Sequence, residues 1–123
     1  MARKILIVDD EPNIVISLEF LMKKEGFVVA VAGDGDAALE QAAAFRPDLV
    51  LLDVMMPKKS GYEVCEQLRG DPSQGDLKIV MLTAKGRESE VAKGIAIGAD
   101  AYVTKPFSTK ELVARVRTLL GMA

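Results

Sequence analysis

The stretch Leu49-Val50-Leu51-Leu52-Asp53 decides the fold of this chain, because four apolar residues run without a break into a carboxylate. An apolar run of this length, bounded by Pro47 and by Met56-Pro57, is typical of a parallel strand that helices cover on both faces. A second run, Ile5-Leu6-Ile7-Val8, ends in the same way at Asp9-Asp10-Glu11. Two core strands therefore deliver acids to one edge of the predicted sheet, and open α/β sheets bind their ligands at that edge.

Composition and charge narrow the class of protein. The chain has 123 residues, of which 50% are hydrophobic and 28% charged, and this is the size of one domain over residues 1–123. The net charge of -2 gives no reason to expect nucleic acid or an anionic membrane as a partner. No apolar run approaches the roughly 18 residues that span a bilayer, and the first residues lack a signal-peptide pattern. We therefore expect a cytoplasmic protein.

Histidine is absent from the sequence, and Cys65 is the single cysteine. The lack of histidine excludes a Ser-His-Asp triad, a histidine zinc site and a phosphohistidine carrier. A lone cysteine excludes an internal disulfide, and Cys65 is expected to pack within a helix because Val64 and Leu68 lie beside it. Carboxylates, hydroxyls and lysines must therefore carry any chemistry.

The rest of the chain alternates between strand and helix patterns. Strands are predicted at 5–8, 27–31, 47–53, 77–83 and 101–104, and helices at 12–26, 37–45, 60–69, 88–97 and from 108 onward. Two Ser-x-x-Glu segments, at 60–63 and 108–111, have the spacing of capping boxes, and Gly33-Asp34-Gly35 predicts a turn and a helix cap. Five strands that alternate with five helices predict a doubly wound α/β fold, with a five-stranded parallel sheet and helices on both faces.

Acidic, hydroxyl and lysine side chains are predicted to meet at one edge of this sheet. If the first and third strands are neighbours, Asp9, Asp10 and Asp53 converge within a few ångströms. Two like charges about 4 Å apart repel by roughly 4 kcal/mol at an effective dielectric constant near 20, so three carboxylates need a cation, a raised pKa or both. An oxygen-only site with few ligands favours Mg²⁺. The simpler alternative is a cluster of acids at solvated strand ends.

Thr83 and Lys105 favour the site over a chance cluster of acids. Both follow apolar strand segments, so the sheet brings them to the edge that carries the three carboxylates. A nucleophilic carboxylate, a metal ion, a hydroxyl and a lysine are the parts needed to accept and stabilise a phosphoryl group. The sequence therefore predicts phosphoryl chemistry at this edge.

These residues resemble the receiver domains of bacterial two-component response regulators, in particular the stand-alone chemotaxis regulators. The resemblance covers nearly the whole chain, through Ile-Leu-Ile-Val-Asp9-Asp10-Glu11, Leu-Leu-Asp53-Val-Met-Met-Pro57, Gly61, Thr83-Ala84 and Lys105-Pro106-Phe107. It implies a flavodoxin-like sheet with strand order 2-1-3-4-5, and it makes Asp53 the residue that is phosphorylated.

The resemblance also implies how a metal ion is held. Asp10 and Asp53 would bind Mg²⁺ directly, and Asp9 would bind it through a water molecule. Met55 would contribute its main-chain carbonyl, which places no demand on its side chain.

Further roles follow from the same resemblance. Thr83 and the amide of Ala84 would contact the phosphoryl oxygens, and Lys105 would neutralise them. The bond between Lys105 and Pro106 is expected to be cis. Tyr102 falls on the aromatic switch position of the family, although an ordinary edge-strand tyrosine is the alternative.

The function implied is a phosphorylation-controlled switch and not a turnover enzyme. A sensor histidine kinase or a histidine phosphotransfer protein would donate to Asp53 in a Mg²⁺-dependent reaction, and the domain would catalyse the transfer and the later hydrolysis. The output would be altered binding of an unidentified partner through the helix at 88–97, the strand at 101–104 and the last helix. The chain would act as a monomer or as a phosphorylation-dependent dimer.

Two other functions remain open from the sequence. An aspartyl-phosphate phosphohydrolase would use the same nucleophile, but such enzymes resemble Asp-x-Asp at a position where this chain has Met55. An interaction module that works without phosphorylation would not need the site, and the intact set of acids, Thr83 and Lys105 argues against it.

Overall fold

The computed structural model describes residues 2–56, 59–84 and 98–122. Within these ranges five parallel strands form one sheet of order β2-β1-β3-β4-β5. The strands are β1 (Lys4–Val8), β2 (Val28–Ala32), β3 (Leu49–Asp53), β4 (Lys78–Ala84) and β5 (Ala101–Lys105). The predicted flavodoxin-like sheet is therefore confirmed, while the predicted helix at 88–97 lies outside the described residues.

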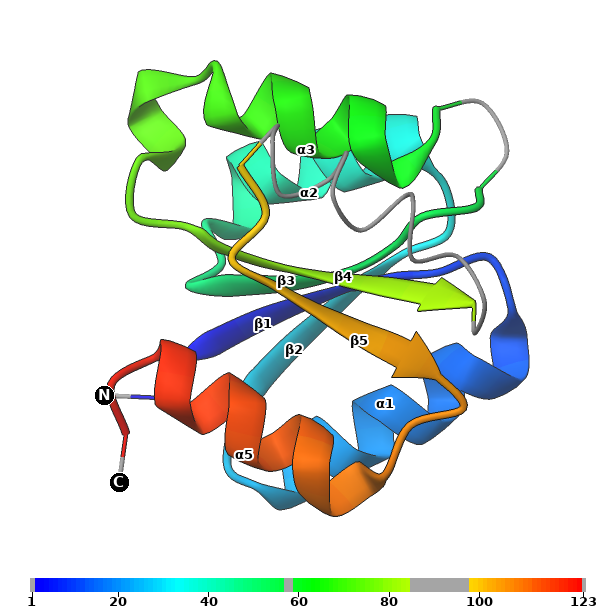
Figure 1. The fold of residues 1–123 in the computed structure, drawn as a ribbon. Helices are drawn as coiled ribbons and strands as arrows, with labels where there is room; N and C mark the ends of the chain where they lie inside the picture. The colour runs from blue at the N-terminus through cyan, green and yellow to red at the C-terminus, as the bar shows by residue number, and fades with distance from the viewer. Residues whose placement is uncertain (1, 57–58, 85–97, 123) are drawn as a thin grey trace.

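Helices cover both faces of the sheet (Figure 1). One face carries α1 (Pro12–Lys24) and α5 (Thr109–Leu119), and the other carries α2 (Gly35–Phe45) and α3 (Gly61–Arg69). A short 3-10 helix, η1 (Pro72–Gln74), connects α3 to β4. None of the described helices is long and apolar enough to cross a membrane.

Side-chain caps begin the helices close to where the sequence predicts them. The Ser60 hydroxyl accepts a hydrogen bond from the Glu63 amide while the Glu63 carboxylate accepts one from the Ser60 amide, which confirms that capping box. The Ser108 hydroxyl likewise accepts from the Glu111 amide at 3.3 Å. The Asp34 carboxylate accepts from the Ala37 amide at 2.8 Å, so α2 begins at Gly35, two residues before the predicted start.

The junction between α1 and β2 differs from the prediction by one or two residues. Helix α1 ends at Lys24, and Gly26 has φ +92°, a backbone conformation that favours glycine. The Phe27 amide then donates to the Met22 carbonyl at 3.1 Å, which is the bond that closes a helix end. Phe27 therefore takes part in the turn that closes the helix, and the strand begins one residue later, at Val28.

Strand alternation divides the apolar core into two layers. Leu6, Val8, Val50 and Leu52 face α2 and α3, where Cys65 is buried among them as predicted. The intervening residues of β1 and β3 face α1 and α5. Because burying a Leu or Ile side chain contributes about 1.5–3 kcal/mol, these strands form a rigid base. The carboxyl ends of these strands position the polar residues of the candidate site.

Candidate functional site

The predicted site residues meet at the carboxyl ends of the strands, here called the carboxyl edge. Val8 of β1 pairs with Leu52 of β3, so Asp9 and Asp53 follow these residues side by side. Thr83 lies near the end of β4 and Lys105 ends β5, where Lys105 pairs with Ala84. The arrowheads of β4 and β5 mark this edge in Figure 1.

Three carboxylates form a cluster that could bind a metal ion. Asp9, Asp10 and Asp53 each place a carboxylate oxygen within 4.8 Å of the others. Asp9 is 1% exposed and Asp53 5% exposed, whereas Asp10 is exposed to solvent. Oxygen donors with one side open to water suit Mg²⁺, which keeps several of its waters when it binds to protein. The residues present therefore fit this ion.

Lys105 reaches across the sheet edge to the acids. Its Nζ lies 2.9 Å from Asp9 Oδ2, 3.4 Å from Asp53 Oδ1 and 3.7 Å from Glu11 Oε1. Burial disfavours the charged ammonium, but the hydrogen bond to Asp9 and the surrounding negative charges outweigh it and raise the pKa of Lys105. The ammonium is thus the cation that offsets the buried carboxylates among the described residues.

The Asp53 carboxyl is only partly compensated by this lysine. The pKa of Asp53 is raised from 3.8 to about 6, because burial and then the charge of Asp9 raise it more than Lys105 and the Met55 amide lower it. The first cause is loss of water around the charged form, and the second is repulsion between like charges. Asp53 is still mostly ionised near neutral pH, so it is available as a nucleophile.

Thr83 provides an unsatisfied polar atom at the same edge. Its side chain is buried, and its Oγ1 has no hydrogen-bond partner in the described part of the chain. Leaving a buried hydroxyl without a partner costs about 1–3 kcal/mol. Within the described residues, the hydroxyl is therefore free to meet a group bound at this edge.

A close backbone contact fixes the segment that follows Asp53. A Cβ atom at Gly61 would lie 2.3 Å from the Asp53 carbonyl oxygen and 2.8 Å from the Val54 Cα, so only glycine fits there. The Gly61 amide donates to the Val54 carbonyl at 2.8 Å. Met55 is 55% exposed, and its amide donates to Asp53 Oδ1 at 3.3 Å. The start of α3 therefore holds the backbone around Asp53 and Met55.

Tyr102 lies in β5, opposite Met81 of β4. Its side chain is half-buried and packs against the core layer that faces α2 and α3. The peptide bond between Lys105 and Pro106 is cis, as expected. The helix assigned to the output face lies outside the described residues, so that surface stays a prediction together with the switch role of Tyr102.

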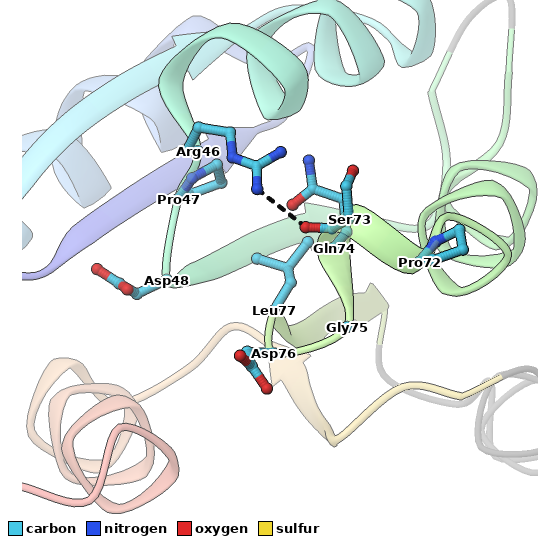
Figure 2. A pocket seen from close by; sticks show the side chains of 9 residues that line it. All are labelled: Arg46, Pro47, Asp48, Pro72, Ser73, Gln74, Gly75, Asp76 and Leu77. Carbon is cyan, nitrogen blue, oxygen red and sulfur yellow. Dashed lines mark hydrogen bonds between the residues drawn. The ribbon is translucent and has the colours of Figure 1, made fainter.

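Two features were not predicted. Glu11 approaches Lys105, although the sequence gave it no role beyond its place after Asp9 and Asp10. A hollow of about 440 Å³ lies at the opposite, amino edge of the sheet, and Figure 2 shows Arg46 donating to the Ser73 carbonyl there at 3.0 Å. This hollow contains none of the predicted site residues, so the chemistry stays at the carboxyl edge.

Comparisons with known proteins agree with this geometry. A family model described as the response regulator receiver domain matches residues 5–117. A candidate response regulator from Chloroflexus aurantiacus J-10-fl is 37% identical with a TM-score of 0.94, over 98% of this chain and 99% of that chain.

Two further solved structures show the same fold. The chemotaxis response regulator CheY4 of Vibrio cholerae is 29% identical with a TM-score of 0.91, over 97% of this chain and 99% of that one. A BeF3-activated DrrB receiver domain is 35% identical with a TM-score of 0.88, over 98% and 99%.

Proposed function

The chain belongs to the response regulator receiver domain family, and from this premise we propose that it is a signalling switch phosphorylated on Asp53. The observation that carries the proposal is the pair of groups that lie around Asp53. A lysine ammonium lies 3.4 Å from its carboxylate, and a buried threonine hydroxyl that has no partner in the described part of the chain reaches the same edge. A solvated cluster of acids would need neither group.

A metal ion belongs to this proposal. The carboxylates of Asp9, Asp10 and Asp53 would hold it together with the main-chain carbonyl of Met55, and Asp9 would act through water. When bound, Mg²⁺ supplies positive charge that neutralises phosphoryl oxygens and orients them.

The chain's own residues supply the rest of the transfer. An oxygen of the ionised Asp53 carboxylate attacks the phosphorus of a donor phosphohistidine, and the phosphorus–nitrogen bond breaks as the phosphorus–oxygen bond forms. Lys105 then exchanges its contact with Asp53 for the phosphoryl oxygens. Thr83 donates its hydroxyl hydrogen to one of these oxygens, which satisfies the orphaned atom, and the Ala84 amide donates to another.

The new charge is what changes the protein. A phosphoryl group adds about -1.5 to -2 charges beside Thr83 and Lys105, enough to draw the threonine toward it. Tyr102 on the neighbouring strand then changes position and alters the surface formed by the segment at 88–97, β5 and α5. The donor is a sensor histidine kinase or a histidine phosphotransfer protein, and the switch works in the cytoplasm as a monomer or a phosphorylation-dependent dimer.

The test is chemical phosphorylation read by mass spectrometry. Incubation with a small phosphodonor and Mg²⁺ should add one phosphoryl mass to the chain, and base should remove it because the product is an acyl phosphate. Asp53→Asn should stay unlabelled, while Asp36→Asn, an acid in the first turn of α2, should label normally. Full labelling of Asp53→Asn would contradict the proposal.

A further inference from the structure

Arg69, at the end of α3, uses all three of its guanidinium nitrogens on residues that flank β4 and β5. Its Nε donates to the Gly98 carbonyl at 2.7 Å and its Nη1 to the Leu77 carbonyl at 2.6 Å, while its Nη2 binds the Asp100 carboxylate. We name these groups, together with the Ile79 backbone described next, the Arg69 cluster. It lies at the amino edge, far along the strands from Asp53.

Asp100 attaches the start of β5 to the start of β4. Its Oδ2 accepts from the Ile79 amide at 2.7 Å, and its own amide donates to the Ile79 carbonyl at 2.8 Å. This contact comes one position before the first ladder pair, Val80 with Ala101. Asp100 therefore sets where the pairing of the two strands begins.

The backbone at Gly98, two residues before Asp100, packs closely against the side chain of Arg69. Gly98 has φ +106°, and a Cβ added there would lie 2.8 Å from Arg69 Cγ. Both the backbone conformation and the close approach therefore require glycine at this position. The segment is built around the side chain of Arg69 and does not merely lie beside it.

The Arg69 cluster adds to the contacts that fix the register of β5. Within the described residues β5 is an edge strand that pairs with β4 alone, and Val103 is its one fully buried residue. A slip by one residue turns every side chain of a strand to the opposite face. Such a slip would remove Lys105 from the carboxylates.

Resting on the proposed function, we infer that Arg69 and Asp100 are positioning residues for the phosphoryl site. They fix the register of β5 on β4, and this register places Lys105 opposite Ala84 and within reach of Asp53. The metal-binding acids come from β1 and β3, whose pairing the Arg69 cluster does not contact. Loss of the cluster should therefore weaken the phosphoryl contacts and spare metal binding.

The experiment measures these two properties separately on the full chain. Mg²⁺ affinity and, at saturating Mg²⁺, affinity for beryllium trifluoride are obtained by NMR titration of the wild type, Arg69→Met and Arg46→Met. The third protein is a matched control, because Arg46 binds the Ser73 carbonyl in η1 and not β5. For Arg69→Met we expect Mg²⁺ affinity no lower than that of the wild type, and beryllium trifluoride affinity lower by roughly tenfold, since an ångström of misplacement can cost still more.

The other results overturn the inference. Unchanged affinities in Arg69→Met would show that β5 keeps its register without the cluster, and an equal loss of both affinities would show a general structural role. If Arg46→Met also lost affinity for beryllium trifluoride and kept its affinity for Mg²⁺, the loss would not be specific to the Arg69 cluster. If Arg69→Met does not fold, Arg69→Lys takes its place, because lysine keeps the positive charge but cannot make all three contacts. The inference then requires that Arg69→Lys loses affinity for beryllium trifluoride and not for Mg²⁺. A wild type that binds Mg²⁺ but not beryllium trifluoride would instead contradict the proposed function.

Discussion

At both ends of strands β4 and β5 a basic side chain lies against aspartate. The two ends differ in whether the opposite charges balance. At the amino edge, Arg69 and Asp100 form an ion pair, and each also hydrogen-bonds to backbone. At the carboxyl edge, Lys105 faces Asp9 and Asp53 together, and Thr83 Oγ1 lacks a partner among the described residues. Among the described residues, Arg69 and Asp100 at the amino edge are paired, whereas the carboxyl edge has more negative than positive charge and an unpaired hydroxyl.

This difference separates structure from function. A polar cluster whose groups are all paired stabilises the fold, so removing a member should destabilise the protein. A cluster that retains unfavourable charge costs stability, and such clusters are common where proteins bind ligands. The two edges should therefore respond to mutation with opposite signs, and the predictions below test this from the largest expected effect to the smallest.

Removing the acid at the amino edge should cost the most. Asp100→Ala leaves the Arg69 guanidinium and the Ile79 amide without their carboxylate, and we expect the free energy of unfolding to fall by about 2–4 kcal/mol. Urea denaturation followed by circular dichroism measures it. A loss below about 0.5 kcal/mol would mean that water replaces the carboxylate and that the edge is not structural.

Removing the acid at the carboxyl edge should stabilise the metal-free protein, in a pH-dependent manner. The folded pKa of Asp53, about 6, lies above its unfolded value of 3.8, so the folded state binds the proton more tightly. Wild-type stability should therefore fall as pH rises from about 4 to 6 and then level off. Relative to wild type, Asp53→Asn should gain up to about 3 kcal/mol at pH 8 and nearly nothing at pH 4.

Urea titrations of both proteins in a chelating buffer, at pH 4 and pH 8, measure this difference. The same substitution at an exposed acid of the amino edge, Asp76→Asn, is the control, because it removes a carboxylate that is not part of the cluster. A wild type that gains stability relative to Asp53→Asn with rising pH would reverse the sign and place Lys105 as a sufficient counter-charge.

Lys105→Met should raise Mg²⁺ affinity severalfold, by about 1 kcal/mol, because the ammonium competes with the ion for the same carboxylates. Calorimetric titration measures the affinity, and Lys4→Met, which removes a lysine that binds the Phe45 carbonyl, serves as control. Weaker Mg²⁺ binding in Lys105→Met would mean that the lysine organises the acids for the metal.

The smallest effect is expected at Thr83. Thr83→Val keeps the shape of the side chain and removes a buried hydroxyl that has no partner among residues 2–56, 59–84 and 98–122, so stability should stay the same or rise by up to about 1 kcal/mol. Phosphorylation of Asp53 should still occur, while the accompanying change in amide chemical shifts of β5 should be blunted. A fully retained shift change would show that the coupling uses other residues.

The sequence predicts the strands, the helix caps and the edge that carries the site residues, but not the contacts between residues far apart in the chain. Strand patterns place Asp9, Asp53, Thr83 and Lys105 at one edge because each follows an apolar run that the sheet must bury. Helix caps such as Ser60 with Glu63 are also local, so spacing alone reveals them.

Contacts between distant residues carry no such local signal. Arg69 and Asp100 are 31 residues apart, and neither falls in a periodic pattern. The orphaned state of the Thr83 hydroxyl depends on what surrounds it in three dimensions. Phe27 looks like the start of a strand, although its amide closes α1. The single domain over 1–123 and the helix at 88–97 stay predictions.

The ion pair between Lys105 and Asp9 joins residues 96 positions apart, and this separation imposes an order on biosynthesis. A growing chain emerges from the ribosome amino terminus first. All three acids have been made by residue 53, but their lysine counter-ion is made among the last residues described. The cluster is thus completed only after β5 has been made, so a nascent chain that lacks β5 carries the three acids without their lysine counter-ion.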